Sequence, residues 1–150
     1  MNLEDAIKQT KPFKDEYTKL GVNLMYTSNW FVGNLKDHFK KFGITIKQFN
    51  ILRILKGADK PVSTNFIRER LLDRMSDVSR IVDRMEDKDL VQKTSCSKDK
   101  RLIDVSLTAQ GLQLLLKVNK SMDRINNLMT NLKPSETKQL NKLLDKLRSN

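Results

Sequence analysis

The residues best able to bind a polyanion lie in the segment SDVSRIVDRMED, residues 76–87, where hydroxyl and charged side chains alternate with apolar ones at helical spacing. Burying the apolar residues turns the others outward. The apolar set is Val78, Ile81, Val82 and Met85, and the outward set is Ser76, Asp77, Ser79, Arg80, Asp83, Arg84 and Asp87. Hydroxyl and guanidinium groups in the N-terminal half of a helix can reach base edges and phosphates in a DNA major groove. A solvated, salt-bridged helix face would show the same pattern.

A second polar segment, SCSKDKR, lies between the alternating, β-branched runs LVQKT and LIDVSL. This pattern predicts a β-hairpin with a basic tip. The tip carries Lys98, Asp99, Lys100 and Arg101, and Lys93 lies at its base. Basic hairpin tips can enter a minor groove, where a narrow A·T tract concentrates negative potential. A charged surface turn is the alternative explanation.

The sequence offers little that could support catalysis. It has one histidine, His38, and one cysteine, Cys96, which cannot supply a structural zinc site without several carboxylates. It also lacks a phosphate-binding glycine loop, an HExxH motif and a nucleophile elbow. We therefore expect no enzymatic activity, no metal site and no cofactor.

Composition favours one mainly α-helical domain over residues 1–150. The chain has 38% hydrophobic residues but only 5 glycines and 3 prolines, which favours long helices over a turn-rich β architecture. The formal net charge of +11 suggests a polyanionic partner, with a solvated basic surface as the alternative. The N-terminus has no hydrophobic signal segment, no long apolar stretch suggests a membrane span, and a single cysteine cannot form an internal disulfide. A cytoplasmic protein is expected.

Helical spacing of apolar residues predicts a series of helices around the hairpin. Thr45 and Gln48 form a capping-box pattern, and Ser63 and Thr108 are further N-cap candidates. The predicted elements are helices over 13–41, 46–56, 63–72 and 76–87, a short strand at Val62, the hairpin, a long helix from Thr108 to about Leu132, and a last helix from Pro134. The outer helices are apolar along one stripe, so they should pack against each other or a second subunit. A monomer in which they cover the central core is the alternative.

The run SDVSRIVDRMEDKDLVQKTSCSKDKRLIDVSLTAQG closely resembles the multiple-antibiotic-resistance regulator (MarR) family of bacterial repressors. The matching motifs are Thr45-x-x-Gln48-Phe49-x-x-Leu52, Val78-Ser79-Arg80 through Arg84-Met85, Asp99-x-Arg101 and Leu107-Thr108-x-x-Gly111. The resemblance covers roughly residues 13–148. It differs at Asp89, where many relatives have a glycine, and aspartate enters the left-handed conformation at some cost.

The resemblance implies a winged helix-turn-helix fold in a homodimer that binds a pseudo-palindromic operator in double-stranded DNA. Residues of about 45–107 would form the DNA-binding lobe, and about 13–41 and 108–150 the dimerisation helices. The DNA-binding residues would be Ser76, Asp77, Ser79, Arg80 and Arg84 in the recognition helix and Lys98, Asp99, Lys100 and Arg101 in the wing, with Arg101 oriented by Asp99.

Many relatives release DNA when a small aromatic molecule binds between the dimer helices and the DNA-binding lobe. In this chain Met25, Tyr26, Trp30 and His38 would line such a crevice, although core packing, or solvent exposure for His38, explains them as well. We expect Cys96 to be an ordinary thiol.

The sequence thus predicts a transcription regulator. Its relatives are more often repressors than activators, so the resemblance implies a repressor that a small ligand releases from DNA. A winged-helix protein-interaction or assembly module without a specific operator is the alternative.

Overall fold

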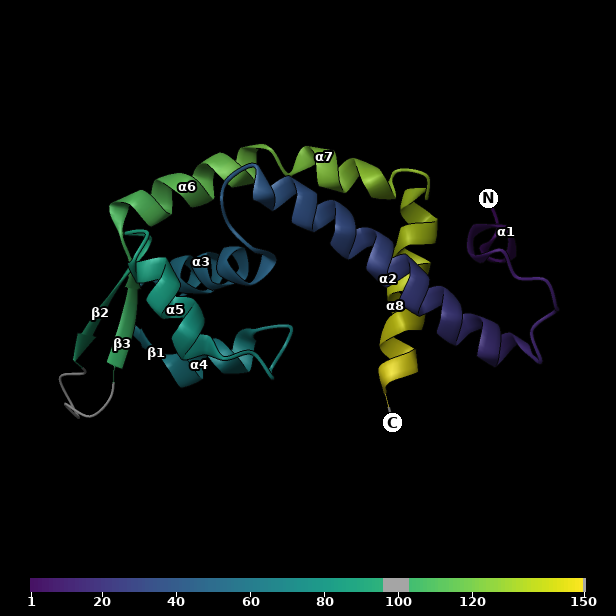
Figure 1. The fold of residues 1–150 in the computed structure, drawn as a ribbon, viewed down its shortest axis with the longest axis horizontal. Helices are drawn as coiled ribbons and strands as arrows, with labels where there is room; N and C mark the ends of the chain where they lie inside the picture. Colours follow the sequence, from purple (N-terminus) through teal and green to yellow (C-terminus); the bar gives the residue numbers. More distant parts are fainter. Residues whose placement is uncertain (96–102, 150) are drawn as a thin grey trace.

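Three helices and a small sheet form a lobe at one end of the molecule, and long helices extend from it toward the other end, where both termini lie (Figure 1). The structure is a computed structural model and describes residues 1–95 and 103–149. The order of elements is α1 (Leu3–Ile7), α2 (Glu16–Lys40), α3 (Ile46–Ala58), β1 (Val62–Ser63), α4 (Thr64–Arg70), α5 (Val78–Glu86), β2 (Val91–Ser95), β3 (Ile103–Leu107), α6 (Ala109–Lys120), α7 (Asp123–Asn126), a short 3-10 turn (Asn127–Met129) and α8 (Pro134–Arg148).

The lobe has a continuous apolar core beneath α3, α4 and α5. Helix α3 begins at the predicted capping box, in which Gln48 N donates to Thr45 Oγ1 and Thr45 N donates to Gln48 Oε1, each over 3.1 Å. Helix α4 begins as predicted at Ser63, whose hydroxyl accepts from Phe66 N, but it ends at Arg70, before the expected Leu72. Side chains from all three helices are fully buried, among them Ile51, Leu52, Ile67, Val78, Val82 and Met85. This core fixes where α4 and α5 present their outer faces.

The sheet is antiparallel with strand order β1-β3-β2. Strands β2 and β3 form the predicted hairpin, in which Val91 pairs with Leu107 and Ser95 with Ile103. The short strand predicted at Val62 is also present and pairs with Val105 of β3. Because β2 lies at the edge of the sheet, one of its sides has no neighbouring strand, and β2 also contacts α5.

A tight junction joins α5, β2 and α6. Asp89 has φ of 55°, so the left-handed turn is formed here without glycine. Its N–H donates to Glu86 O over 2.8 Å, and its carbonyl accepts from Thr108 Oγ1 over 2.6 Å. Thr108 is also the N-cap of α6, as predicted. The start of α6 is therefore tied directly to the end of α5.

The helices outside the lobe differ from the sequence prediction in two ways. The long helix expected from Thr108 to about Leu132 is interrupted at Ser121, so the prediction of one continuous helix is wrong. The Ser121 hydroxyl donates to Val118 O over 2.7 Å and lies 3.0 Å from His38 Nε2, so it bonds to α2 where α6 ends. The short helix α1, joined to α2 by a 2.6 Å ion pair between Glu4 and Lys19, was not predicted.

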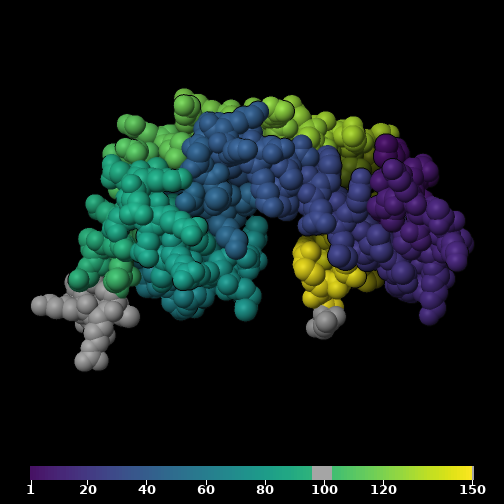
Figure 2. Space-filling model, in the orientation of Figure 1, coloured from purple at the N-terminus to yellow at the C-terminus, as the bar shows by residue number. Residues whose placement is uncertain are grey.

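Helix α8 crosses the N-terminal half of α2 at the end of the molecule away from the lobe (Figure 1). Over its whole length it has no buried residue, and Leu140, Leu143 and Leu147 are between 44% and 54% exposed. The surface between α8 and α2 holds a groove of about 690 Å³, lined mainly by leucines of both helices. The space-filling view shows an arch, hollow between the lobe and α8 (Figure 2).

Candidate nucleic-acid interface

The N-terminal end of α5 presents a row of exposed polar side chains. Asp77 caps the helix, since its carboxylate accepts from Arg80 N over 3.2 Å, and the same carboxylate lies 3.4 Å from Arg80 Nε. The Arg80 side chain is nevertheless 80% exposed. Asp77, Ser79, Arg80 and Arg84 all project outward as predicted, and Ile81, expected to be buried, is half-buried. The arrangement leaves two arginines and a hydroxyl free to reach a groove or a phosphate.

Ser76 does not belong to this exposed row. It is only 7% exposed, and its hydroxyl donates to Asp73 Oδ2 over 3.0 Å. The expectation that Ser76 faces outward is wrong because its hydroxyl is used within the turn that precedes α5.

Asp73 ties that turn to the start of α3. Its carboxylate also accepts from Met75 N and lies 2.8 Å from Lys47 Nζ. The hydrogen bonds from Lys47 and then from Ser76 lower the pKa of the Asp73 carboxyl below its ordinary value. Asp73 stays ionised at neutral pH and holds the turn against α3.

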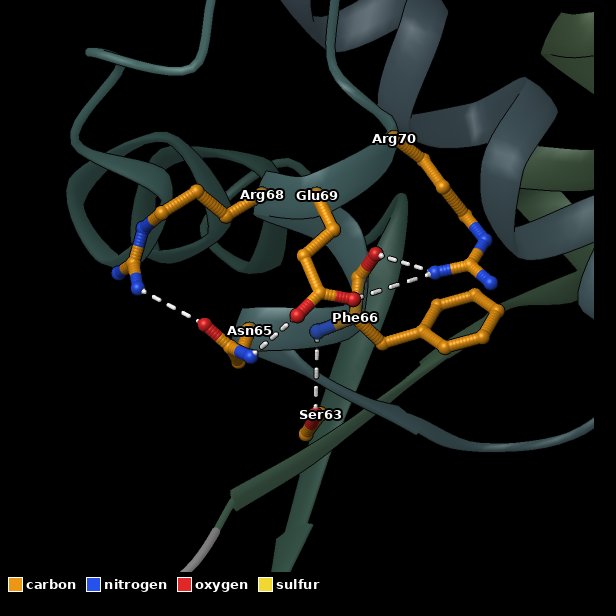
Figure 3. A network of polar contacts seen from close by, with 6 residues as sticks. All are labelled: Ser63, Asn65, Phe66, Arg68, Glu69 and Arg70. Atoms are coloured by element: carbon orange, nitrogen blue, oxygen red, sulfur yellow. Dashed lines mark hydrogen bonds and ion pairs between the residues drawn. The ribbon is translucent and has the colours of Figure 1, made fainter.

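Helix α4 adds basic side chains that the sequence analysis did not assign to the interface (Figure 3). The Arg70 guanidinium lies 3.5 Å from the centre of the Phe66 ring, donates to Phe66 O over 3.2 Å and pairs with Glu69. Arg68 donates to Asn65 Oδ1, and Asn65 in turn donates to Glu69. The sequence already indicated this, because FIRER places two arginines on the helix that precedes the predicted recognition helix. In helix-turn-helix proteins that first helix crosses the DNA backbone.

The base of the wing is joined to α5 by Lys93. Its ammonium lies 2.8 Å from both Asp83 Oδ1 and Glu86 Oε2. The other predicted wing residues, Lys98, Asp99, Lys100 and Arg101, lie outside the described residues, as does Cys96.

The four predicted ligand-binding residues are not brought together. Met25, Tyr26 and Trp30 are 68%, 42% and 43% exposed on α2, whereas His38, near its C-terminal end, is 6% exposed. The idea that His38 faces solvent is wrong, since its ring packs 5.5 Å from the rings of Phe39 and Phe42. None of the four lines the groove between α2 and α8.

The described residues contain no group of three or more histidine, cysteine, aspartate or glutamate side chains that could hold a metal ion. In the same part of the chain, no helix has the length and apolar character needed to cross a membrane.

Helix α4, its turn and α5, followed by the hairpin of β2 and β3, define a winged helix-turn-helix protein. Residues 42–102 match the sequence model of the MarR family. The transcriptional regulator MgrA of Staphylococcus aureus is 29% identical over 109 residues, 73% of each chain. The transcriptional repressor MdtR of Bacillus subtilis is 36% identical over 75 residues, half of this chain and 48% of that protein. Residues 42–102, which include α4, α5 and β2, are thus similar to a MarR-family domain.

Solved structures show the same fold over nearly the whole chain. The organohalide-sensing regulator RdhR-CbdbA1625, in its 2,4-dichlorophenol-bound form, matches with a TM-score of 0.82 and 21% identity, covering 93% of this chain and 86% of that one. A mutant of MarR from E. coli in complex with operator DNA matches with a TM-score of 0.80 and 23% identity, covering 92% of this chain and 99% of that one. The fold therefore extends beyond the matched segment to the outer helices.

Proposed function

We propose that this protein is a sequence-specific transcription regulator that binds double-stranded DNA through α5 and the wing. The observation that carries the proposal is the exposed end of α5, where Ser79, Arg80 and Arg84 project from a helix whose other face is buried. A single helix of this kind fits a B-DNA major groove. The net charge of +11 favours association with a phosphate backbone.

The proposed organisation is one domain, 1–150, with residues of about 45–107 as the DNA-binding lobe. The outer helices, about 13–41 and 108–150, would join two copies on a pseudo-palindromic operator. MgrA is named a regulator and MdtR a repressor, which favours regulation over catalysis for this chain. Such a regulator would act in the cytoplasm, where bacterial DNA lies.

Release from DNA by a small aromatic effector is part of the proposal, since RdhR-CbdbA1625 has been solved with 2,4-dichlorophenol bound. Tyr26 and Trp30 are both exposed on α2. In the proposed dimer, these two side chains would contact such a ligand together with residues of the second copy. A winged-helix assembly module without an operator is the competing function, and it would show no preference among DNA duplexes.

The decisive experiment measures binding of the full chain to a duplex from its own upstream intergenic region, with a random duplex of equal length as competitor. A sequence-specific regulator prefers the upstream duplex by orders of magnitude. Equal affinity for the two duplexes would favour the assembly module.

The site itself is tested with Arg80→Ala. We expect a loss of about 1–3 kcal/mol on the upstream duplex and a much smaller loss on the random one, because a base-reading arginine carries sequence information. The matched control is Arg148→Ala on α8, since Arg148 pairs with Asp145 three residues before it, as Arg80 pairs with Asp77. An Arg80→Ala protein that binds like the control would remove Arg80 from the interface.

A further inference from the structure

Lys93 on the edge strand β2 lies between two carboxylates of α5. Its ammonium is 2.8 Å from Asp83 Oδ1 and 2.8 Å from Glu86 Oε2. Asp83 and Glu86 are three residues apart, so they lie on the same face of α5, and their contacts with Lys93 turn this face toward β2.

The contact also involves the backbone of β2. Lys93 N donates to Glu86 Oε1 over 3.0 Å. Because β2 is an edge strand, an outward N–H such as this one has no strand partner, and Glu86 takes the place of one. Glu86 thus holds both the backbone and the side chain of Lys93, which fixes the position of the strand as well as the charge.

The charges of this cluster reinforce one another. The hydrogen bonds to Asp83 and then to Glu86 raise the pKa of Lys93, and those from Lys93 lower the pKa of Glu86. The Lys93 side chain is 28% exposed, less than either partner at 56% and 38%. A single exposed ion pair contributes little to stability. Here, however, two carboxylates share one partly covered ammonium, and one of them also accepts a backbone hydrogen bond, so the contact has a defined geometry.

We propose that Lys93 is a positioning residue that fixes strand β2, at the base of the wing, against the recognition helix α5 for binding to DNA. The inference rests on the DNA-binding function proposed above. It assigns Asp83 and Glu86 to the wing rather than to DNA, and explains why a DNA-reading helix carries two acids. Without a structural role of this kind, the two carboxylates would only repel the DNA phosphates.

Removing the acids separates positioning from simple electrostatics. The double variant Asp83→Asn/Glu86→Gln makes α5 more positive by two charges, so electrostatics alone predicts tighter DNA binding. If the variant instead loses the geometry of the wing, its affinity for the upstream duplex should fall by about tenfold. A loss of this size lies within the range expected for one lost base contact. Binding to the random duplex should stay equal or become tighter.

Changes at Lys93 test the same contact from the strand. Lys93→Met should lower affinity for the upstream duplex by about the same factor, and Lys93→Arg, which keeps the charge and donors, should retain it. Lys56→Met, at an exposed lysine on α3 that belongs neither to the named DNA-binding residues nor to the dimerisation helices, controls for the loss of one positive charge. Circular dichroism and thermal unfolding verify that each variant is folded, as expected for partly exposed side chains.

Two results would overturn the inference. One is an Asp83→Asn/Glu86→Gln protein that binds the upstream duplex as tightly as wild type or more tightly. The other is a Lys93→Met protein that weakens on both duplexes alike and flattens the dependence of log K on log salt by about one, which marks a direct phosphate contact. If instead the wild-type chain does not distinguish the duplexes, the proposed function fails, independently of Lys93.

Discussion

His38 is a buried histidine, and the ordinary pKa of a histidine lies near neutral pH. It is 6% exposed, and its Nε2 lies 3.0 Å from the hydroxyl of Ser121, where α6 ends. Burial, and then the positive charges of Lys41 and Arg124, lower the pKa of His38 below its ordinary value. The folded protein therefore favours the neutral imidazole at a point that joins α2 to the helices after the lobe.

This gives a pH dependence with a defined sign. The unfolded histidine takes up a proton as the pH falls through about 6.5, whereas the folded one resists it, so the unfolded state binds more protons. The stabilisation from neutral His38 is present above that pH and is lost below it. We expect the free energy of unfolding, measured by urea titration, to fall between about pH 7 and about pH 5.5.

The control is His38→Gln, because His38 is the only histidine of the chain. The lowered pKa values of Asp73 and Glu86 place their titration in more acidic solution, outside this window. The variant should lose most of the pH dependence. An equal slope in wild type and variant would show that the effect arises elsewhere.

Among the elements, those defined by local patterns could be predicted from the sequence. The Thr45–Gln48 capping box, the N-caps at Ser63 and Thr108, and the alternating runs of the hairpin each depend on residues within a few positions of one another. At the break, Ser121 bonds to His38, 83 positions earlier, and no local pattern contains that contact.

The same limit applies to the candidate site. The exposed face of α5 follows from helical spacing, so Asp77, Ser79, Arg80 and Arg84 could be predicted. The burial of Ser76 depends on how the preceding turn closes around Asp73. The ion pair between Lys93 and Asp83 depends on how α5 packs against β2. Helical spacing treats all polar positions as outward, whereas tertiary contacts decide which of them are used inside the protein.

Helix α6 offers a stability test, because it begins against the backbone of the α5–β2 turn. A Cβ on Gly111 would lie 2.0 Å from Leu90 O and 2.9 Å from Leu90 C, both backbone atoms. Alanine normally favours a helix over glycine by about 1 kcal/mol. Here the clash should outweigh that gain, and Gly111→Ala should lower the free energy of unfolding by about 1–3 kcal/mol.

Gly57→Ala in α3 is the matched control, since no atom lies within 4 Å of its added Cβ. Thermal unfolding should show a higher Tm for Gly57→Ala and a lower Tm for Gly111→Ala. Equal shifts in the two variants would mean that the turn at Leu90 moves away from α6 at little cost.

At the scale of the whole molecule, the lobe has a hydrophobic core, whereas α8 at the other end has none. The core cluster in the described part of the chain runs from Phe39 at the end of α2 to Val118 in α6, whereas α8 buries no residue along its whole length. An isolated helix of 15 residues is marginally stable in water. Its exposed leucines and the groove beside α2 therefore favour a second copy as the missing partner.

We accordingly expect light scattering at micromolar concentration to give roughly twice the 17.4 kDa of one chain. The double variant Leu143→Glu/Leu147→Glu should be monomeric, because it places two charges on the apolar side of α8. It should also lose helical signal in circular dichroism, since an unpaired α8 has little to hold it folded. Leu72→Glu, at a leucine that is 91% exposed on the lobe, should remain dimeric and fully helical. A single chain has only one predicted recognition helix and one wing. A wild-type monomer under these conditions would therefore contradict the proposal that two lobes bind a pseudo-palindromic operator together.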